Sequence, residues 1–188
     1  MREARFQPRG FLRFDLRHGQ LSTPDQRRYL VVPADLVRES DIDPEMKQAA
    51  RRWGEEQGAA LKGLVGPDVL ERSPDELVNE LAHLLATFGW GLCELETWGG
   101  VAFVVARHAP RGGATAILAQ FLAGVFSAIG EDRFECVPIQ RDGSVYFVLT
   151  GPECAAEIRS WVAQGAEVAD VARRMHAGEH LPASLGGR

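Results

Sequence analysis

Histidine, cysteine and carboxylate side chains are the groups of this chain that can perform acid–base, nucleophilic or metal chemistry. Among the five histidines, His83 lies on a predicted helix and His108 follows a predicted strand. Either ring could act as a general base if a partner held it in place. The alternative is a boundary position for His83 and a polar loop contact for His108. The sequence places no partner of known geometry beside either ring, so we expect structural roles.

The cysteines and paired carboxylates also favour structural roles. Cys93, Cys136 and Cys154 are too few and too scattered for a disulfide framework, and none stands at metal-ligand spacing to a histidine. We expect small buried side chains, with a reactive or acylated thiol as the alternative. Glu94 and Glu96 share one face of a predicted strand, where solvation is commoner than catalysis. With no Walker, GxGxxG, HExxH or GxSxG motif present, we predict no enzyme, no catalytic residue, no metal and no cofactor.

Aromatic side chains are a stronger sign of binding. Six fall on predicted apolar faces or at their ends: Trp53, Phe88, Trp90, Phe103, Phe121 and Phe126. Small-molecule pockets are mostly apolar and aromatic, so these six residues are the candidate ligand-binding site for a hydrophobic small molecule. The alternative is that they simply form core, as aromatic stripes at helical spacing usually do.

Three predicted helices position most of these rings. A capping box, Ser73-Pro74-Asp75-Glu76, opens one helix, and Gly89 ends it. Its apolar stripe consists of Leu77, Leu81, Leu84, Leu85 and Phe88. A second helix runs from 43 to 64 and contains Gly54 and Gly58. Glycine destabilises a helix interior by up to about 1 kcal/mol, so the pair predicts close approach of another backbone or simple tolerance.

The third helix, 114–129, carries a wide apolar stripe but is too short and too interrupted to span a bilayer. Predicted strands surround it: 92–97 and 101–107 form one hairpin, and 133–139 and 144–149 form another. A last helix starts at Pro152 and is interrupted by Gly165. Weaker strand patterns occur in 11–16 and 29–32, before a short helix near 34–37.

These elements predict an α/β (α+β) fold, a twisted antiparallel sheet of two hairpins packed against four or more helices. We divide the chain into N-terminal strands and connector (1–40), a core α/β domain (41–150), a C-terminal helix (151–176) and a flexible tail (177–188). The length of 188 residues suffices to bury a core.

Composition and charge narrow the function classes. The formal net charge is −5, which gives no basic field for nucleic acid or anionic lipid. The arginine pairs 27–28, 51–52 and 173–174 lie among acids, and we expect them on solvated faces. No signal peptide or membrane-spanning run is found, so the expected location is cytoplasmic, without membrane insertion.

Several strings, in order over about residues 10–150, resemble the bacterial 4-vinyl-reductase domain family, relatives of the transport-protein-particle subunits. They are Arg28-Tyr29-Leu30-Val31-Val32-Pro33, Ala50-Arg51-Arg52-Trp53-Gly54-Glu55-Glu56-Gln57-Gly58, Phe88-Gly89-Trp90-Gly91, Phe121-Leu122-Ala123-Gly124 and Tyr146-Phe147-Val148-Leu149. The resemblance implies a transport-protein-particle-like fold that often dimerises through helices, in sensor domains or assembly modules. Many members carry a cysteine-rich metal site near the last hairpin. Only Cys136 remains there, with Val145 and Tyr146 where another cysteine is expected, and this departure from the family pattern argues against a metal here.

A shorter span is similar to the family of D-type accessory proteins of cellulose synthase, which are non-catalytic, ring-forming components of glucan export. The matching strings are Glu80-Leu81-Ala82-His83-Leu84-Leu85-Ala86, Trp90-Gly91, His108-Ala109-Pro110 and the run from Leu118 to Gly124. The predicted N-terminal strands and C-terminal helix extend beyond that pattern.

The leading hypothesis is therefore a non-enzymatic, self-associating module that binds a hydrophobic small molecule or a partner protein. A homo-oligomer, dimer or higher, is expected from apolar surface left over at a helix seam. The alternative is a structural accessory subunit of a bacterial cellulose or exopolysaccharide synthesis and export complex. An enzyme that uses His83 or His108 is the third and weakest class.

Overall fold

The computed structural model describes residues 13–15, 20–22, 28–29, 42–65, 74–110 and 112–178. The chain divides into two compact units, Met1–Leu36 and Val37–Arg188. The first unit holds a three-stranded antiparallel sheet of order β1-β2-β3: Arg13–Asp15, Gln20–Ser22 and Arg28–Tyr29. The predicted helix near 34–37, the cap at Ser73 and the tail beyond 178 lie outside the described residues.

The second unit contains a four-stranded antiparallel sheet of order β4-β5-β7-β6. Its strands are β4 (Leu92–Trp98), β5 (Val101–Arg107), β6 (Glu135–Arg141) and β7 (Ser144–Thr150). Two-residue turns at 99–100 and 142–143 close the two hairpins, and all four turn residues have positive φ, as a type I′ turn requires. The two predicted hairpins are confirmed, although β6 begins two residues later than expected.

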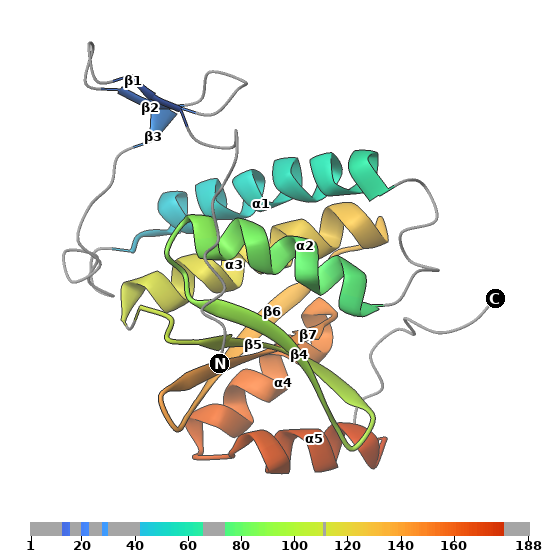
Figure 1. Ribbon diagram of the computed structural model, residues 1–188. Coiled ribbons are helices and arrows are strands. Elements are labelled where there is room, and N and C mark those ends of the chain that lie inside the picture. The colour runs from blue at the N-terminus through green and yellow to red at the C-terminus, as the bar shows by residue number, and fades with distance from the viewer. Residues whose placement is uncertain are drawn as a thin grey trace, which may run out of the picture. The chain divides into compact units, whose positions relative to one another are not determined.

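Five helices of the described residues pack around this sheet. They are α1 (Pro44–Val65), α2 (Pro74–Thr87), α3 (Gly113–Gly130), α4 (Pro152–Ala163) and α5 (Val168–His176). Helices α1, α2 and α3 lie on one side of the sheet, and α4 and α5 lie on the other (Figure 1). The predicted α+β fold is therefore confirmed. The single C-terminal helix expected over 151–176 is two helices, because the chain turns at Gly165, whose φ is +91°.

Strand alternation gives the sheet an apolar layer on each face. Phe103, Val105 and Tyr146 pack with residues of α4 and α5 in one buried cluster. The intervening residues Val104 and Ala106 point to the opposite face and are also buried. This double burial explains why the β5 sequence is almost continuously apolar.

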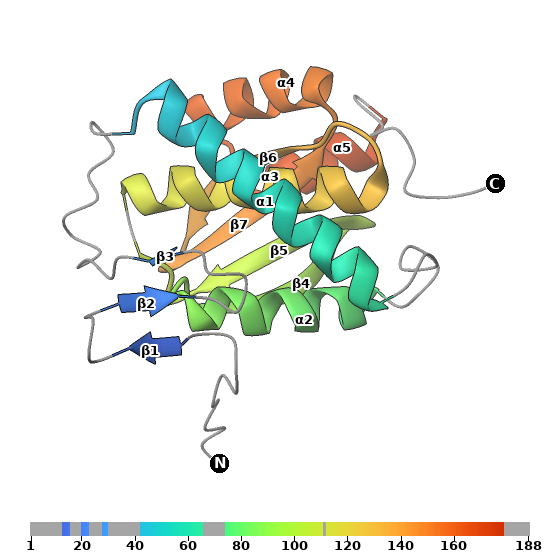
Figure 2. The ribbon, with the colours of Figure 1, turned by 90° about the horizontal axis from the view of Figure 1, so that it is seen from above.

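Helices α1 and α3 meet backbone to backbone, so of the two interpretations of the α1 glycines, close approach is the one observed. A Cβ atom on Gly54 would lie 2.0 Å from the carbonyl oxygen of Phe121, and one on Gly58 would lie 2.4 Å from that of Val125. From the other side, a Cβ on Gly124 would lie 2.1 Å from the oxygen of Arg51. Figure 2 shows α1 crossing over α3, which lies between α1 and the sheet. Contrary to the expectation that it is too short, α3 is long and apolar enough to cross a membrane, yet most of it is buried, as expected of a core helix.

Candidate functional site

Four of the six predicted site residues meet in one place, which we call the aromatic cluster. It consists of Trp53 from α1, Phe88 and Trp90 from the turn between α2 and β4, and Phe121 from α3. The Trp53 ring centroid lies 4.7 Å from that of Phe121, 4.9 Å from Phe88 and 5.4 Å from Trp90. Trp90 is 5.1 Å from Phe121 and 6.1 Å from Phe88. Phe121 is fully buried, whereas the other three side chains are half-buried.

The turn that carries Trp90 is fixed by its backbone. The N–H of Trp90 donates to the Leu85 carbonyl at 3.0 Å, and that of Gly89 donates to Ala86 at 3.1 Å. With Gly89 at φ +73°, this pattern is a Schellman motif, the common end of an α-helix. Gly91 follows at φ +92°, and a Cβ there would lie 2.2 Å from the carbonyl oxygen of Arg107. The two glycines therefore hold the Trp90 ring against α3.

The other two predicted site residues lie elsewhere. Phe103 is on the opposite face of the sheet, where its ring centroid is 6.3 Å from that of Tyr146. Phe126 follows Phe121 by five residues on α3. At about 100° per residue, it points roughly 140° away from Phe121 around the helix. Phe126 therefore belongs to the wide apolar stripe of α3 but lies outside the aromatic cluster.

A second site contradicts an expectation from the sequence. Arg51 was expected on a solvated face with Arg52, but only 17% of its side chain is exposed. Its guanidinium donates to the Phe134 carbonyl at 2.7 Å and to the Ser127 hydroxyl at 3.3 Å. Arg52, one residue on, is exposed as predicted. The close packing of α1 on α3 explains the difference, because it brings Arg51 to the start of β6.

Glu135 is the centre of this second site, and sequence analysis did not identify it. Its carboxylate side chain, 12% exposed, accepts a hydrogen bond from Arg51 at 3.1 Å and one from Arg159 on α4 at 3.0 Å. Arg133 approaches the same oxygen as Arg51, at 3.8 Å. The sequence does contain one indication: Glu135 shares a strand face with the apolar residues Val137 and Ile139, a pattern that predicts a buried carboxylate.

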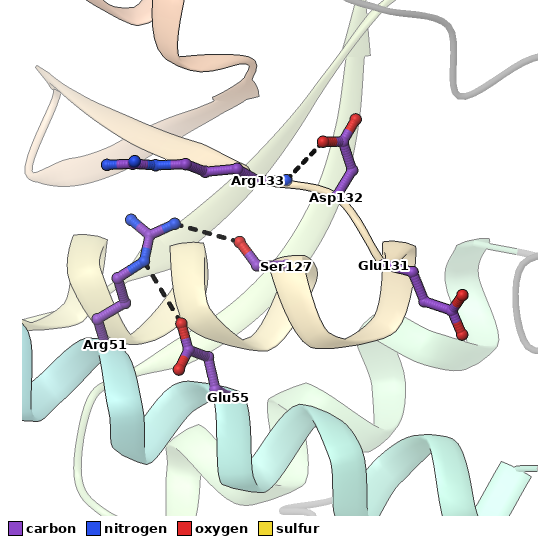
Figure 3. A pocket seen from close by; sticks show the side chains of 6 residues that line it. All are labelled: Arg51, Glu55, Ser127, Glu131, Asp132 and Arg133. Atoms are coloured by element: carbon purple, nitrogen blue, oxygen red, sulfur yellow. Dashed lines mark hydrogen bonds and ion pairs between the residues drawn. The ribbon is translucent and has the colours of Figure 1, made fainter.

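An open cleft of about 490 Å³ lies beside Glu135. We call it the arginine cleft; it is lined by Arg51, Glu55, Ser127, Glu131, Asp132 and Arg133. In Figure 3 the side chains of Arg51 and Arg133 extend toward the same end of the cleft, while those of Glu131 and Asp132 point away from Arg51. Glu55 lies beside Arg51, with 3.6 Å between its carboxylate and the Arg51 Nε.

The remaining candidates for chemistry are exposed or protonated. His83 and His108 are both exposed. Burial raises the pKa of the Cys93 thiol to about 12, with a smaller contribution from Glu94. Burial also raises the pKa of Cys136, helped by Glu135 and opposed by Arg51. Both thiols therefore stay protonated at neutral pH, where a thiolate nucleophile would be needed.

The carboxylates of Glu94 and Glu96 both hold one cation. Each accepts a hydrogen bond from Arg107 at 2.6 Å, on an exposed part of the sheet. Within residues 42–65, 74–110 and 112–178 and the short strands, no three histidine, cysteine or acidic side chains are placed to hold a metal ion.

Comparison with known proteins does not establish a family. No family model matches the chain, and no curated protein matches it. Among solved structures, the chain is similar to the phenol-responsive sensory domain of the transcription activator PoxR, crystallised with phenol. The identity is 14% and the TM-score is 0.49, over 79% of this chain and 90% of that one. The resemblance to the 4-vinyl-reductase domain family therefore stays a prediction.

Proposed function

We propose that this chain is a non-enzymatic binding module whose aromatic cluster receives an apolar small molecule. One observation carries the proposal: three half-buried aromatic side chains, from two elements distant in sequence, gather around a fully buried Phe121. Partly exposed aromatic rings that a rigid backbone holds together are the usual lining of a small-molecule site.

The chemistry of the cluster selects the class of ligand. Neighbouring rings such as Trp53 and Phe88 meet nearly edge to face, with 81° between their planes. Another flat apolar molecule can join such an arrangement, and each aromatic pair contributes about 0.5–1.5 kcal/mol beyond the burial of its area. Burial itself contributes about 25 cal/mol per Å² of apolar surface. The Schellman turn reduces the ordering cost, because Trp90 is positioned before a ligand arrives.

The protonation of the buried thiols and the exposure of the two histidines favour a binding role over catalysis. The buried thiols of Cys93 and Cys136 have raised pKa values, and the two candidate histidines are exposed rather than lining the aromatic cluster. Alanine at His83 and His108 together should therefore leave binding of an apolar probe unchanged. Loss of a detected turnover in that variant would restore the enzyme hypothesis.

The test uses N-phenyl-1-naphthylamine, a neutral apolar fluorophore excited by energy transfer from tryptophan. We expect saturable binding that Trp90→Leu weakens at least about tenfold, since it removes one face of the cluster. Trp161→Leu is the matched control, because Trp161 is also half-buried but belongs to the α4–α5 side of the sheet. Equal affinities of the two variants would overturn the proposal.

Self-association is the second part of the proposal. Among the described residues, Leu92 is the most exposed large hydrophobic side chain, at 56%, and it lies on the edge strand β4. We expect Leu92→Lys to lower the molar mass measured by light scattering, with Met46→Lys on α1 as the control. A monomer in the unmodified protein at micromolar concentration would contradict this part. The cellulose-export alternative gains no support from these sites and stays a prediction.

A further inference from the structure

We propose that the arginine cleft, at the end next to Glu135, is a binding site for an oxyanion, the phosphate or carboxylate group of a small molecule, held by Arg133 in the cleft lining and by Arg159, which reaches Glu135 from α4. The site is separate from the aromatic cluster and does not depend on the function proposed for it. Its volume of about 490 Å³ lies in the range of small-molecule sites.

Around Glu135 the guanidinium groups outnumber the carboxylates, although the six residues that line the cleft include two arginines and three acidic residues. Three guanidinium groups, those of Arg51, Arg133 and Arg159, converge on the carboxylate of Glu135. Glu55 offsets part of the charge of Arg51. Arg133 and Arg159 share the single negative charge of Glu135 with Arg51, so their own charges are only partly balanced. An added anion would balance the remaining charge.

The three arginines differ in how many of their N–H donors already form hydrogen bonds within the protein. Arg51 already bonds to Glu135, Ser127 and the Phe134 carbonyl, so most of its donors are occupied. Arg159 makes one such bond and is 49% exposed. Arg133 only approaches Glu135, and its side chain is 73% exposed. A guanidinium presents several N–H groups in a flat fork that fits phosphate and carboxylate, so Arg133 and Arg159 retain donors for a ligand.

The acidic residues of the cleft leave its basic end open. Glu131 is engaged by Lys62, and Asp132 accepts the backbone N–H of Arg133 at 2.7 Å. Both carboxylates point away from the Arg51 guanidinium in Figure 3. Glu135 and Ser127 hold Arg51 in place and so act as positioning residues.

Isothermal titration with inorganic phosphate and with succinate tests the site, with sodium chloride at equal ionic strength as the reference for screening. We expect saturable binding of at least one of the two anions. Arg133→Gln and Arg159→Gln should each weaken that binding at least about tenfold, since each removes a charged donor. Arg173→Gln is the matched control, since its side chain is 74% exposed and pairs within α5. Circular dichroism shows whether each variant is folded.

The outcomes separate the sources of the oxyanion. Binding of phosphate alone assigns a phosphorylated ligand, and binding of succinate alone assigns a carboxylic acid; either supports the site. Heat that does not saturate, or that matches the chloride reference, would overturn the proposal. So would an equal loss of affinity in Arg173→Gln, because general surface charge would then explain the binding. Since Arg133 is exposed, an unfolded Arg133→Gln would also contradict the proposed geometry of the cleft.

Discussion

The aromatic cluster and the arginine cleft begin from the same turn of α1, yet different forces assemble them. Trp53 joins rings that pack by shape and burial, whereas Arg51, two residues earlier, joins a network of charge-assisted hydrogen bonds. The first needs only apolar neighbours at helical spacing. The second needs one carboxylate at one position, because a nearly buried charge without its partner is costly. Tolerance to substitution should therefore differ sharply between the two sites.

The largest expected effect is a difference in the alkylation rates of the three cysteines. Each of the two regions has a buried cysteine nearby, whereas Cys154 is half-buried. Cys93 follows Trp90 by three residues in β4, and Cys136 is adjacent to Glu135. Iodoacetamide at about pH 8 should modify the half-buried Cys154 at least about a hundredfold faster than either, since thiolate is the reactive form. Peptide mass spectrometry measures the three rates. Faster reaction at Cys136 than at Cys93 would show that the ionic region opens more readily.

Gly54→Ala should disrupt both regions together. Its new Cβ would meet the backbone oxygen of Phe121, which cannot move aside as a side chain can. We expect a loss of about 3 kcal/mol or more in the free energy of unfolding, at the upper end for overpacked sites. Gly63→Ala on the same helix has open space around it and should stabilise the protein by roughly 0.5–1 kcal/mol. Urea denaturation compares them, and similar values would contradict the close α1–α3 contact.

Glu135→Gln should disrupt the arginine cleft and leave the aromatic cluster intact. It removes the carboxylate that three guanidiniums share, and only Arg51 keeps another, that of Glu55. We expect a loss of about 2–3 kcal/mol in the free energy of unfolding, below the full cost of a buried pair because the site is partly open. Binding of N-phenyl-1-naphthylamine to the aromatic cluster should stay within about twofold. An equal loss of stability and probe affinity would mean that the regions are not independent.

Glu94→Gln should change the free energy of unfolding least, and it is the exposed reference for Glu135→Gln. It removes the same kind of bond, from Arg107, but on an exposed part of the sheet. Exposed ion pairs contribute about 0–1 kcal/mol, so the free energy of unfolding should change by less than about 0.5 kcal/mol. A cost equal to that of Glu135→Gln would show that burial is not what distinguishes the two networks.

The sequence predicted the features that depend on local patterns. The hairpin turns at Gly99-Gly100 and Asp142-Gly143, the helix ends and the close approach at Gly54 all follow from glycine positions and apolar spacing. Four of the six predicted rings lie together, but Phe103 could not be assigned to the other sheet face before the register was known. The arginine cleft was missed, because Arg51 and Glu135 are 84 positions apart and no short pattern links them.

Three glycines, Gly54, Gly58 and Gly124, let the backbones of α1 and α3 pack directly against each other, because none of these positions has room for a Cβ atom. A slide of α1 by one residue would set a Cβ atom where Gly54 or Gly58 now faces a carbonyl oxygen, so the glycines favour this register of α1 on α3. Trp53 and Arg51 lie two residues apart on α1, so the register that the glycines favour sets the position of both side chains over α3 at once.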